Sequence, residues 1–251
     1  MPSRAGADHT PAIAAAMIDA AARYGHAPAV TVRSATHRSE QSYAGLAQWV
    51  AKGAHLLESL VDENSVVIGN GDATPGPRVG LDAPPSWIAA SAALATWWIG
   101  GTITLGGPAP IMIRDEHRAR SSDANAAVFC VGAAIDGGPT GTCDGESWPQ
   151  TVQPFPDNPP PPQFLRTALR AETDHTPDDL LAIAADQGTG RAALRAGSTD
   201  AVTALVAVAL RPLVIGRSTV VLDGVDDSAA DEERVTTWIE GARRPGGRAE
   251  H

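Results

Sequence analysis

The stretch from Arg78 to Gly107, RVGLDAPPSWIAASAALATWWIGGTITLGG, constrains the fold more than any other part of the chain. It predicts a short strand, then a helix begun by Pro84-Pro85, whose missing N–H groups cost nothing in a first turn. The residues of this helix are apolar or small over most of its circumference, which is typical of a buried helix. Gly100-Gly101 can end it, and Thr102–Leu105 suits a second strand. The pattern predicts a right-handed βαβ crossover, and therefore an α/β fold with a mixed or mostly parallel sheet and flanking helices.

Hydrophobic spacing assigns most of the remaining chain. It predicts helices over 11–24, over an amphipathic stretch capped by Ser42, and over 199–210 and 229–241, and strands over 29–33, 38–41, 126–131 and 218–223. Residues 65–69 suit a short strand, but the stretch 64–77 is rich in Gly, Pro, Asp and Asn, which favours an inserted loop over most of it. The proline tract Pro159–Pro162 must be extended. It suggests an α/β lobe over 1–145, a linker over 146–163, a second α/β lobe over 164–242 and a disordered tail over 243–251.

Composition excludes several classes of function. With 19 Lys plus Arg against 29 Asp plus Glu, the formal charge is −10, which disfavours nucleic acid or an anionic membrane as the main partner. The chain has no apolar run of membrane-spanning length, and no signal peptide is recognised, so we expect a soluble cytoplasmic protein. Cys130 and Cys143 can pair, but without an export signal we expect two reduced thiols.

Lys52 is the only lysine of the chain. It falls in the amphipathic helix after Ser42, on the face that Gln48 and His55 turn outward, and does not follow a glycine-rich turn. A phosphate-loop lysine, a Schiff-base lysine or a lysine held over an adenylate is therefore not expected.

The best candidate site lies within LLAIAADQGTGRAALRAG, residues 180–197. An apolar strand is expected to run into Gly188-Thr189-Gly190-Arg191, whose amides and hydroxyl can cradle a phosphate. An ordinary surface turn is the alternative. Asp223, Asp226 and Asp227 suggest a solvated turn more than a cation site, and Asp174, His175 and Asp179 lack a nucleophile. We predict no catalytic residue and no metal site.

Two regions together resemble the adenylate-forming enzymes, the acyl-CoA synthetase and AMP-binding superfamily. SYAGLAQWVAKGAHLLES and the tryptophan-rich stretch after it match that superfamily's N-terminal region, at these positions: Tyr43, Leu46, Ala54, Leu57, Gly76, Arg78, Val79, Trp87 and Gly101. Pro77 replaces its acid. The resemblance covers residues 10–107 well and residues 178–240 loosely. More narrowly, the chain looks like a member of a short actinobacterial-type family that keeps only the N-terminal part of the synthetase fold. In the looser part, Gly188, Thr189, Gly190 and Arg191 fall where the superfamily has its phosphate loop, but that loop's serine, second threonine, proline and lysine are missing.

The departures set the functional expectation. The superfamily's adenine motif, ribose-binding aspartate motif and C-terminal domain with its lysine have no counterpart, so the resemblance implies a degenerate homologue without ligase activity. ATP or AMP, or an acyl ligand, is expected to bind weakly near Gly188–Arg191. The alternative is a scaffold or regulatory protein that binds a protein partner or a second copy of itself. A small hydrolase ranks last, because no nucleophile–base pair is found.

Overall fold

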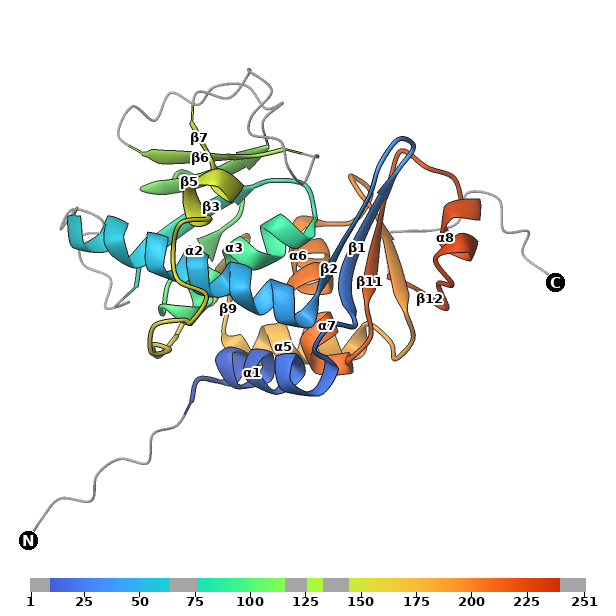
Figure 1. Cartoon of the computed structure of the whole chain (residues 1–251), viewed down its shortest axis with the longest axis horizontal. Coiled ribbons are helices and arrows are strands. Elements are labelled where there is room, and N and C mark those ends of the chain that lie inside the picture. Colours follow the sequence, from blue (N-terminus) through green and yellow to red (C-terminus); the bar gives the residue numbers. More distant parts are fainter. Residues whose placement is uncertain (1–9, 64–75, 116–125, 133–144, 240–251) are drawn as a thin grey trace, which may run out of the picture.

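The computed structural model describes residues 10–63, 76–115, 126–132 and 145–239, which form two sheets with helices between and beneath them (Figure 1). The helices are α1 (Ala12–Tyr24), α2 (Tyr43–Glu63), α3 (Trp87–Trp98), α4 (Trp148–Val152), α5 (Pro177–Asp186), α6 (Ala201–Ala209), α7 (Arg211–Ile215) and α8 (Ser228–Glu232). This is the α/β class that the sequence predicts, with mostly parallel sheets.

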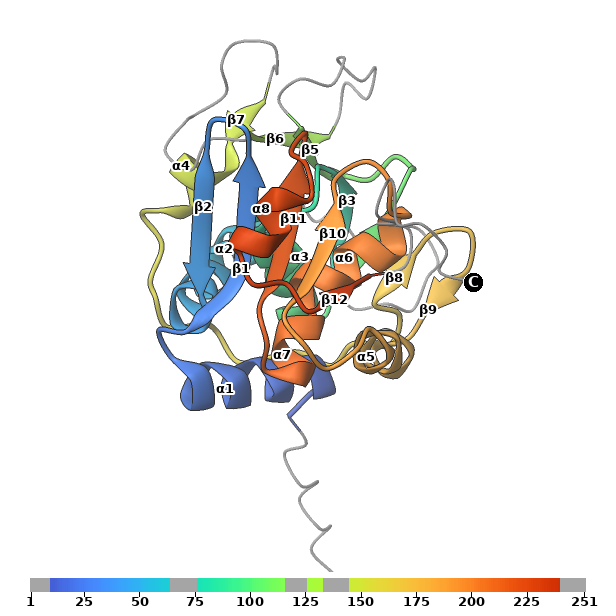
Figure 2. The ribbon, with the colours of Figure 1, turned by 90° about the vertical axis from the view of Figure 1, so that its right-hand side faces the viewer.

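The first sheet has five strands in the order β12-β10-β11-β1-β2, and all neighbours are parallel except β1 and β2. Its strands are β1 (Pro28–Ser34), β2 (Arg38–Ser42), β10 (Ala192–Arg195), β11 (Thr219–Asp223) and β12 (Thr237–Trp238). Figure 2 shows this sheet face-on, with α8 across its outer surface. Val30 in β1 lies opposite Thr219 in β11, so two strands that are far apart in the sequence are direct neighbours in this sheet.

The second sheet has seven strands in the order β7-β6-β5-β3-β4-β8-β9, parallel except for the last pair. Its strands are β3 (Arg78–Asp82), β4 (Thr102–Thr104), β5 (Ile111–Asp115), β6 (Ala127–Val131), β7 (Glu146–Ser147), β8 (Leu169–Arg170) and β9 (Asp174–His175). Each sheet therefore takes strands from both sides of the proline-rich stretch 146–163, so that stretch does not separate one sheet from the other.

Helix α3 lies at the centre of the molecule, between the two sheets and against α2 and α6 (Figure 1). All 12 of its residues are buried, as an apolar circumference predicts. The parallel pairing of β3 and β4 on either side of it confirms the βαβ unit. Its N-cap is Ser86, whose hydroxyl accepts from the amide of Ala89, so the two prolines precede the helix instead of beginning it. Gly100, at φ +73°, supplies the expected left-handed residue.

Two expected elements are wrong. The apolar run after Thr176 is the helix α5 and not a strand, because Thr176 and Asp179 form a reciprocal capping box ahead of it. The last helix stops at Glu232 instead of continuing to 241; Arg234 takes a positive φ of 54°, and the chain then extends into β12. The strand expected over 65–69 and the tail over 243–251 lie outside the described residues.

The sequence predicts that Lys52 and His55 point into solvent. In the structure, both side chains instead hold the proline-rich segment against α2. Lys52 Nζ donates to the carbonyl oxygens of Gln153 at 2.9 Å and Phe155 at 2.7 Å, and it lies 2.9 Å from the Asp157 carboxylate. His55 Nε2 lies 2.9 Å from the carbonyl of Asn158. Side chains of α2 thereby satisfy carbonyl groups of a segment made of turns and bends.

Cys130, at the carboxyl half of β6, is disulfide-bonded. The expectation of reduced thiols is therefore wrong. Cys143, the only other cysteine of the sequence, lies outside the described residues.

Candidate functional site

A cavity of about 410 Å³ opens where strands of the two sheets end, and we call it the inter-sheet cavity. It lies at the carboxyl ends of β3, β4, β5 and β10 and at the amino ends of α3 and α6. Its lining residues are Leu81, Asp82, Ala83, Pro84, Pro85, Ala89, Leu105, Gly106, Asp115, Gly197, Thr199, Ala201, Ala204, Leu205 and Val208. The volume lies in the range of small-molecule sites.

The position of this cavity follows from strand order. After β3 the chain adds β4 on one side, and it then returns to add β5 on the other side of β3. The connecting chains therefore diverge at β3, which leaves a crevice outside the carboxyl ends of β3 and β5. Open α/β sheets bind ligands at such switch points. Asp82 and Asp115 end these two strands and both line the inter-sheet cavity.

The inter-sheet cavity is lined mainly by apolar residues, which we call its apolar floor. Ala89, Leu205 and Val208 form buried parts of that floor. Thr199 Oγ1 is buried and has no hydrogen-bond partner among the described residues. Because a buried hydroxyl without a partner is unfavourable, this atom is a suitable contact for a polar group of a ligand.

The predicted phosphate turn lies elsewhere, at the amino end of β10, whereas the inter-sheet cavity begins beyond the carboxyl end of that strand. A helix precedes the turn, and a strand follows it, so it is not a strand–loop–helix phosphate site. The turn is organised by Arg211, which is fully buried and donates to the carbonyl oxygens of Gln187, Gly188 and Gly190. Arg211 also donates to the carbonyls of Arg217 and Ser218.

These contacts orient the peptide planes of the turn. In a trans peptide the C=O and the following N–H point in opposite directions. With the carbonyls of Gln187, Gly188 and Gly190 turned toward Arg211, the amides of Gly188, Thr189 and Arg191 point away from it. The turn therefore presents amides outward, as an anion-binding nest does.

The other features of the predicted site have structural partners. A Cβ on Gly190 would collide with the Thr236 hydroxyl, and one on Gly188 would lie 2.8 Å from the Thr237 methyl, so β12 packs against both glycines. Arg191 Nη2 lies 2.8 Å from the Glu233 carboxylate. Thr189 is exposed. The four residues are thus brought together, but the arginine is paired with an acid.

Arg191 belongs to a set of arginines that fasten the segment 225–235 across the outer face of the five-stranded sheet. Arg38 Nε donates to Glu233 at 2.6 Å, and Arg33 lies 3.2 Å from Glu232. Arg195 pairs with Asp227. The hydrogen bond from Arg38 lowers the pKa of the Glu233 carboxyl, since a charged donor favours the carboxylate. Beneath the segment lie Ala193, Val220 and Leu222.

Two further sequence candidates, Asp179 and Asp226, take structural roles. Asp179 caps α5, and hydrogen bonds from Thr176 lower its pKa. Asp226 accepts from Ser228 at the start of α8. Within the described ranges, no cluster of three or more His, Cys, Asp or Glu side chains is placed to hold a metal ion, and no helix has the length and apolarity to cross a membrane.

The α/β fold of this chain is similar to that of a solved acyl-CoA synthetase. A crystal structure of an acyl-CoA synthetase from Brucella canis superposes with a TM-score of 0.61 at 17% identity, over 89% of this chain and 46% of that one. The chain thus spans about half the length of that enzyme. No family model and no curated protein matches the sequence. The similarity establishes the fold alone.

Sequence reasoning missed the inter-sheet cavity. Its residues are scattered from Leu81 to Val208 and carry no motif. The one available signal was the strand ending in Asp82, because ligand-binding residues gather where parallel strands end. The sequence pattern does not predict the strand that ends in Asp115.

Proposed function

We propose that this chain binds a nucleotide-like small molecule in the inter-sheet cavity and does not ligate it to an acyl group. The observation that carries the proposal is the position of the cavity at the switch point between β3 and β5, where folds of this class bind ligands. The apolar floor suits a base or another flat apolar group. The carboxylates of Asp82 and Asp115 and the hydroxyl of Thr199 can accept hydrogen bonds that hydroxyl or amino groups of a ligand donate.

Two features support the absence of ligation. Adenylation develops negative charge between a carboxylate and the α-phosphate, which adenylate-forming enzymes offset with magnesium and a lysine. The only lysine here, Lys52, is committed to the carbonyls of Gln153 and Phe155. Arg191, the basic residue of the remnant turn, is paired with Glu233. A chain without these groups should lose several kcal/mol of transition-state stabilisation.

Thermal unfolding with adenosine and with AMP tests where the ligand binds. Adenosine has the base and hydroxyls but no phosphate, so it reports on the inter-sheet cavity. We expect adenosine to raise the melting temperature in proportion to its concentration, and Ala201→Phe, which fills the exposed mouth of the cavity, to abolish the rise. Ala182→Phe, on an exposed face of α5 outside the cavity, is the matched control. Equal loss in both variants, or no shift at millimolar adenosine, contradicts the proposal.

A second candidate is a phosphate site at Gly188–Arg191, favoured by the amides that Arg211 turns outward. In this case AMP and ATP–magnesium stabilise the protein while adenosine does not. Thr189→Pro removes one of the amides, and Thr189→Ala removes only the hydroxyl. A shift with AMP that survives Thr189→Ala and disappears in Thr189→Pro supports this turn. If no nucleotide shifts the melting temperature and the protein associates with rising concentration, the protein-partner alternative is favoured instead.

A further inference from the structure

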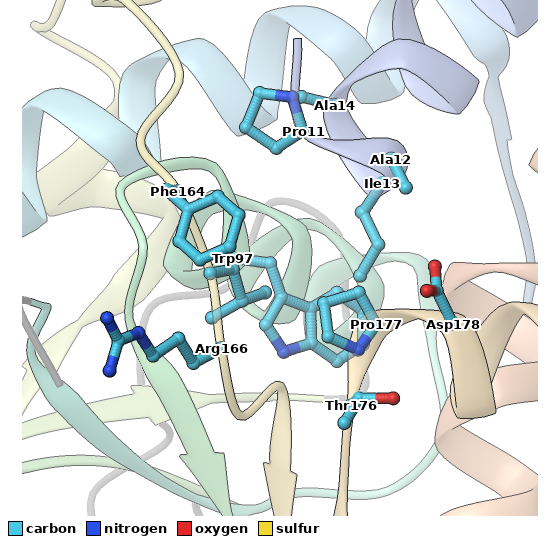
Figure 3. Close-up of a pocket in the computed structure, with 11 residues that line it drawn as sticks. Pro11, Ala12, Ile13, Ala14, Trp97, Phe164, Arg166, Thr176, Pro177 and Asp178 are labelled. Carbon is cyan, nitrogen blue, oxygen red and sulfur yellow. The ribbon is translucent and has the colours of Figure 1, made fainter. Parts of the chain in front are cut away.

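A second cavity of about 380 Å³ lies between the amino ends of α1 and α5. We call it the helix-end cavity. Its lining residues are Pro11, Ala12, Ile13, Ala14, Trp97, Phe164, Leu165, Arg166, Thr176, Pro177 and Asp178 (Figure 3). It shares no residue with the inter-sheet cavity or with the turn Gly188–Arg191, so it is a separate candidate site.

The walls of the helix-end cavity are apolar and well fixed. Ile13, Trp97 and Leu165 are at most 5% exposed, and the Trp97 indole is held by a 2.7 Å hydrogen bond from Nε1 to the carbonyl of Ala168. Phe164 is different, because 67% of its surface is exposed although its ring stands at the cavity. An apolar ligand here would remove the Phe164 ring from water, which favours binding.

The charges at the two ends of this cavity differ in how they are balanced. Figure 3 shows Arg166 and Asp178 on opposite sides. Asp178 stands in the first turn of α5, whose positive end offsets its charge. Arg166 is exposed, and no described carboxylate lies within ion-pair distance of it. Among the described residues, the uncompensated charge at the helix-end cavity is therefore positive.

We propose that the helix-end cavity binds a small amphipathic anion, with its apolar part against Trp97, Ile13 and Phe164 and its anionic group at Arg166. Apolar walls with one polar contact that fixes orientation are typical of small-molecule sites. The guanidinium supplies a charge-assisted hydrogen bond, which selects an anion over a neutral or cationic head group.

Octanoate, octanol and octylamine, titrated into the ¹⁵N-labelled full chain, test this proposal by head group. The readout is the indole N–H resonance of Trp97, which is one of six tryptophans and is assigned with Trp97→Phe. We expect saturable movement of this resonance with octanoate, binding about tenfold weaker with octanol, and no saturation with octylamine.

Variants locate the site and its charge. Arg166→Gln should weaken octanoate binding about five- to tenfold, and Arg166→Lys should restore part of the loss. Ala12→Phe, at an exposed residue lining the cavity, should abolish binding, whereas Ala15→Phe, exposed one turn further along α1 and outside the cavity, should not. Equal binding of octanoate and octylamine, no response of Trp97, or equal loss in the two alanine variants would overturn the proposal.

Discussion

Nη2 of the fully buried Arg211 lies 3.0 Å from the carbonyl oxygen of Gly188 and donates a hydrogen bond to it. Burial lowers the pKa of this guanidinium, because desolvation disfavours its charge. The lost water is replaced as acceptor by five carbonyl oxygens, those of Gln187, Gly188, Gly190, Arg217 and Ser218. The remnant turn and the start of β11 are thus joined through one side chain.

Arg211→Met should lower the free energy of unfolding by about 3 kcal/mol, because it leaves several buried carbonyls without a donor. Arg217→Met is the matched control, since that side chain is exposed on the same segment, and it should change stability by less than about 0.5 kcal/mol. Urea denaturation followed by circular dichroism measures both. Similar stabilities of the two variants would show that the carbonyls find other donors.

Lys52→Met should release the segment 153–158 from α2 and lower the free energy of unfolding by about 1–2 kcal/mol, since two carbonyls lose a charged donor. Hydrogen exchange gives the sharper readout. The amide of Phe155, which donates to Val152 O at 3.1 Å, should exchange faster. Gln48→Met, exposed about one turn earlier on α2, should leave this amide unchanged.

Glu233 should make stability depend on pH. Its pKa is lowered in the folded protein, so its contribution is complete above the ordinary value of about 4.3 and is lost as pH falls through the folded pKa. Glu233→Gln should therefore cost about 1–2 kcal/mol near pH 7, and the difference from wild type should shrink below about pH 4. Glu232→Gln, at a side chain 65% exposed, should cost under about 0.5 kcal/mol at any pH. A pH-independent difference for Glu233→Gln would contradict the ion pairing.

Thr199→Val should leave stability unchanged or raise it by up to about 1 kcal/mol, because it removes a buried hydroxyl that has no partner. Thermal unfolding of the ligand-free protein measures this, and adenosine should then bind more weakly. Marked destabilisation of the ligand-free variant would show that the hydroxyl already serves the fold.

Local chemistry was enough to predict the central unit. The apolar circumference of 87–98 and the glycines after it specify α3, its burial and the strands on either side. Ser42 was recognised as a cap, and its hydroxyl accepts from the amide of Gly45 at 3.1 Å. In contrast, the short apolar run of α5 favours a strand, although Thr176-Pro177 with Asp179 three residues after Thr176 is a helix-start pattern.

The candidate sites could not be predicted in the same way. The role of Arg211 depends on carbonyl groups more than 20 residues away in the chain. Because every residue has a backbone carbonyl, the sequence does not indicate which of them a buried arginine contacts. Arg191 has the residue type of a phosphate ligand, yet its partner Glu233 lies 42 positions later. Cavities form where elements fail to fill the space between them, which depends on packing and not on any single stretch.

The pairing of β1 with β11 has a consequence for how this protein is made. Val30 can meet Thr219 only after the residues between them have been synthesised. Until then the β1–β2 hairpin lacks its parallel neighbour, and such distant pairings close late because they cost loop entropy. The β1–β2 hairpin must therefore wait, with an unpaired edge exposed, until residues 219–223 have been synthesised.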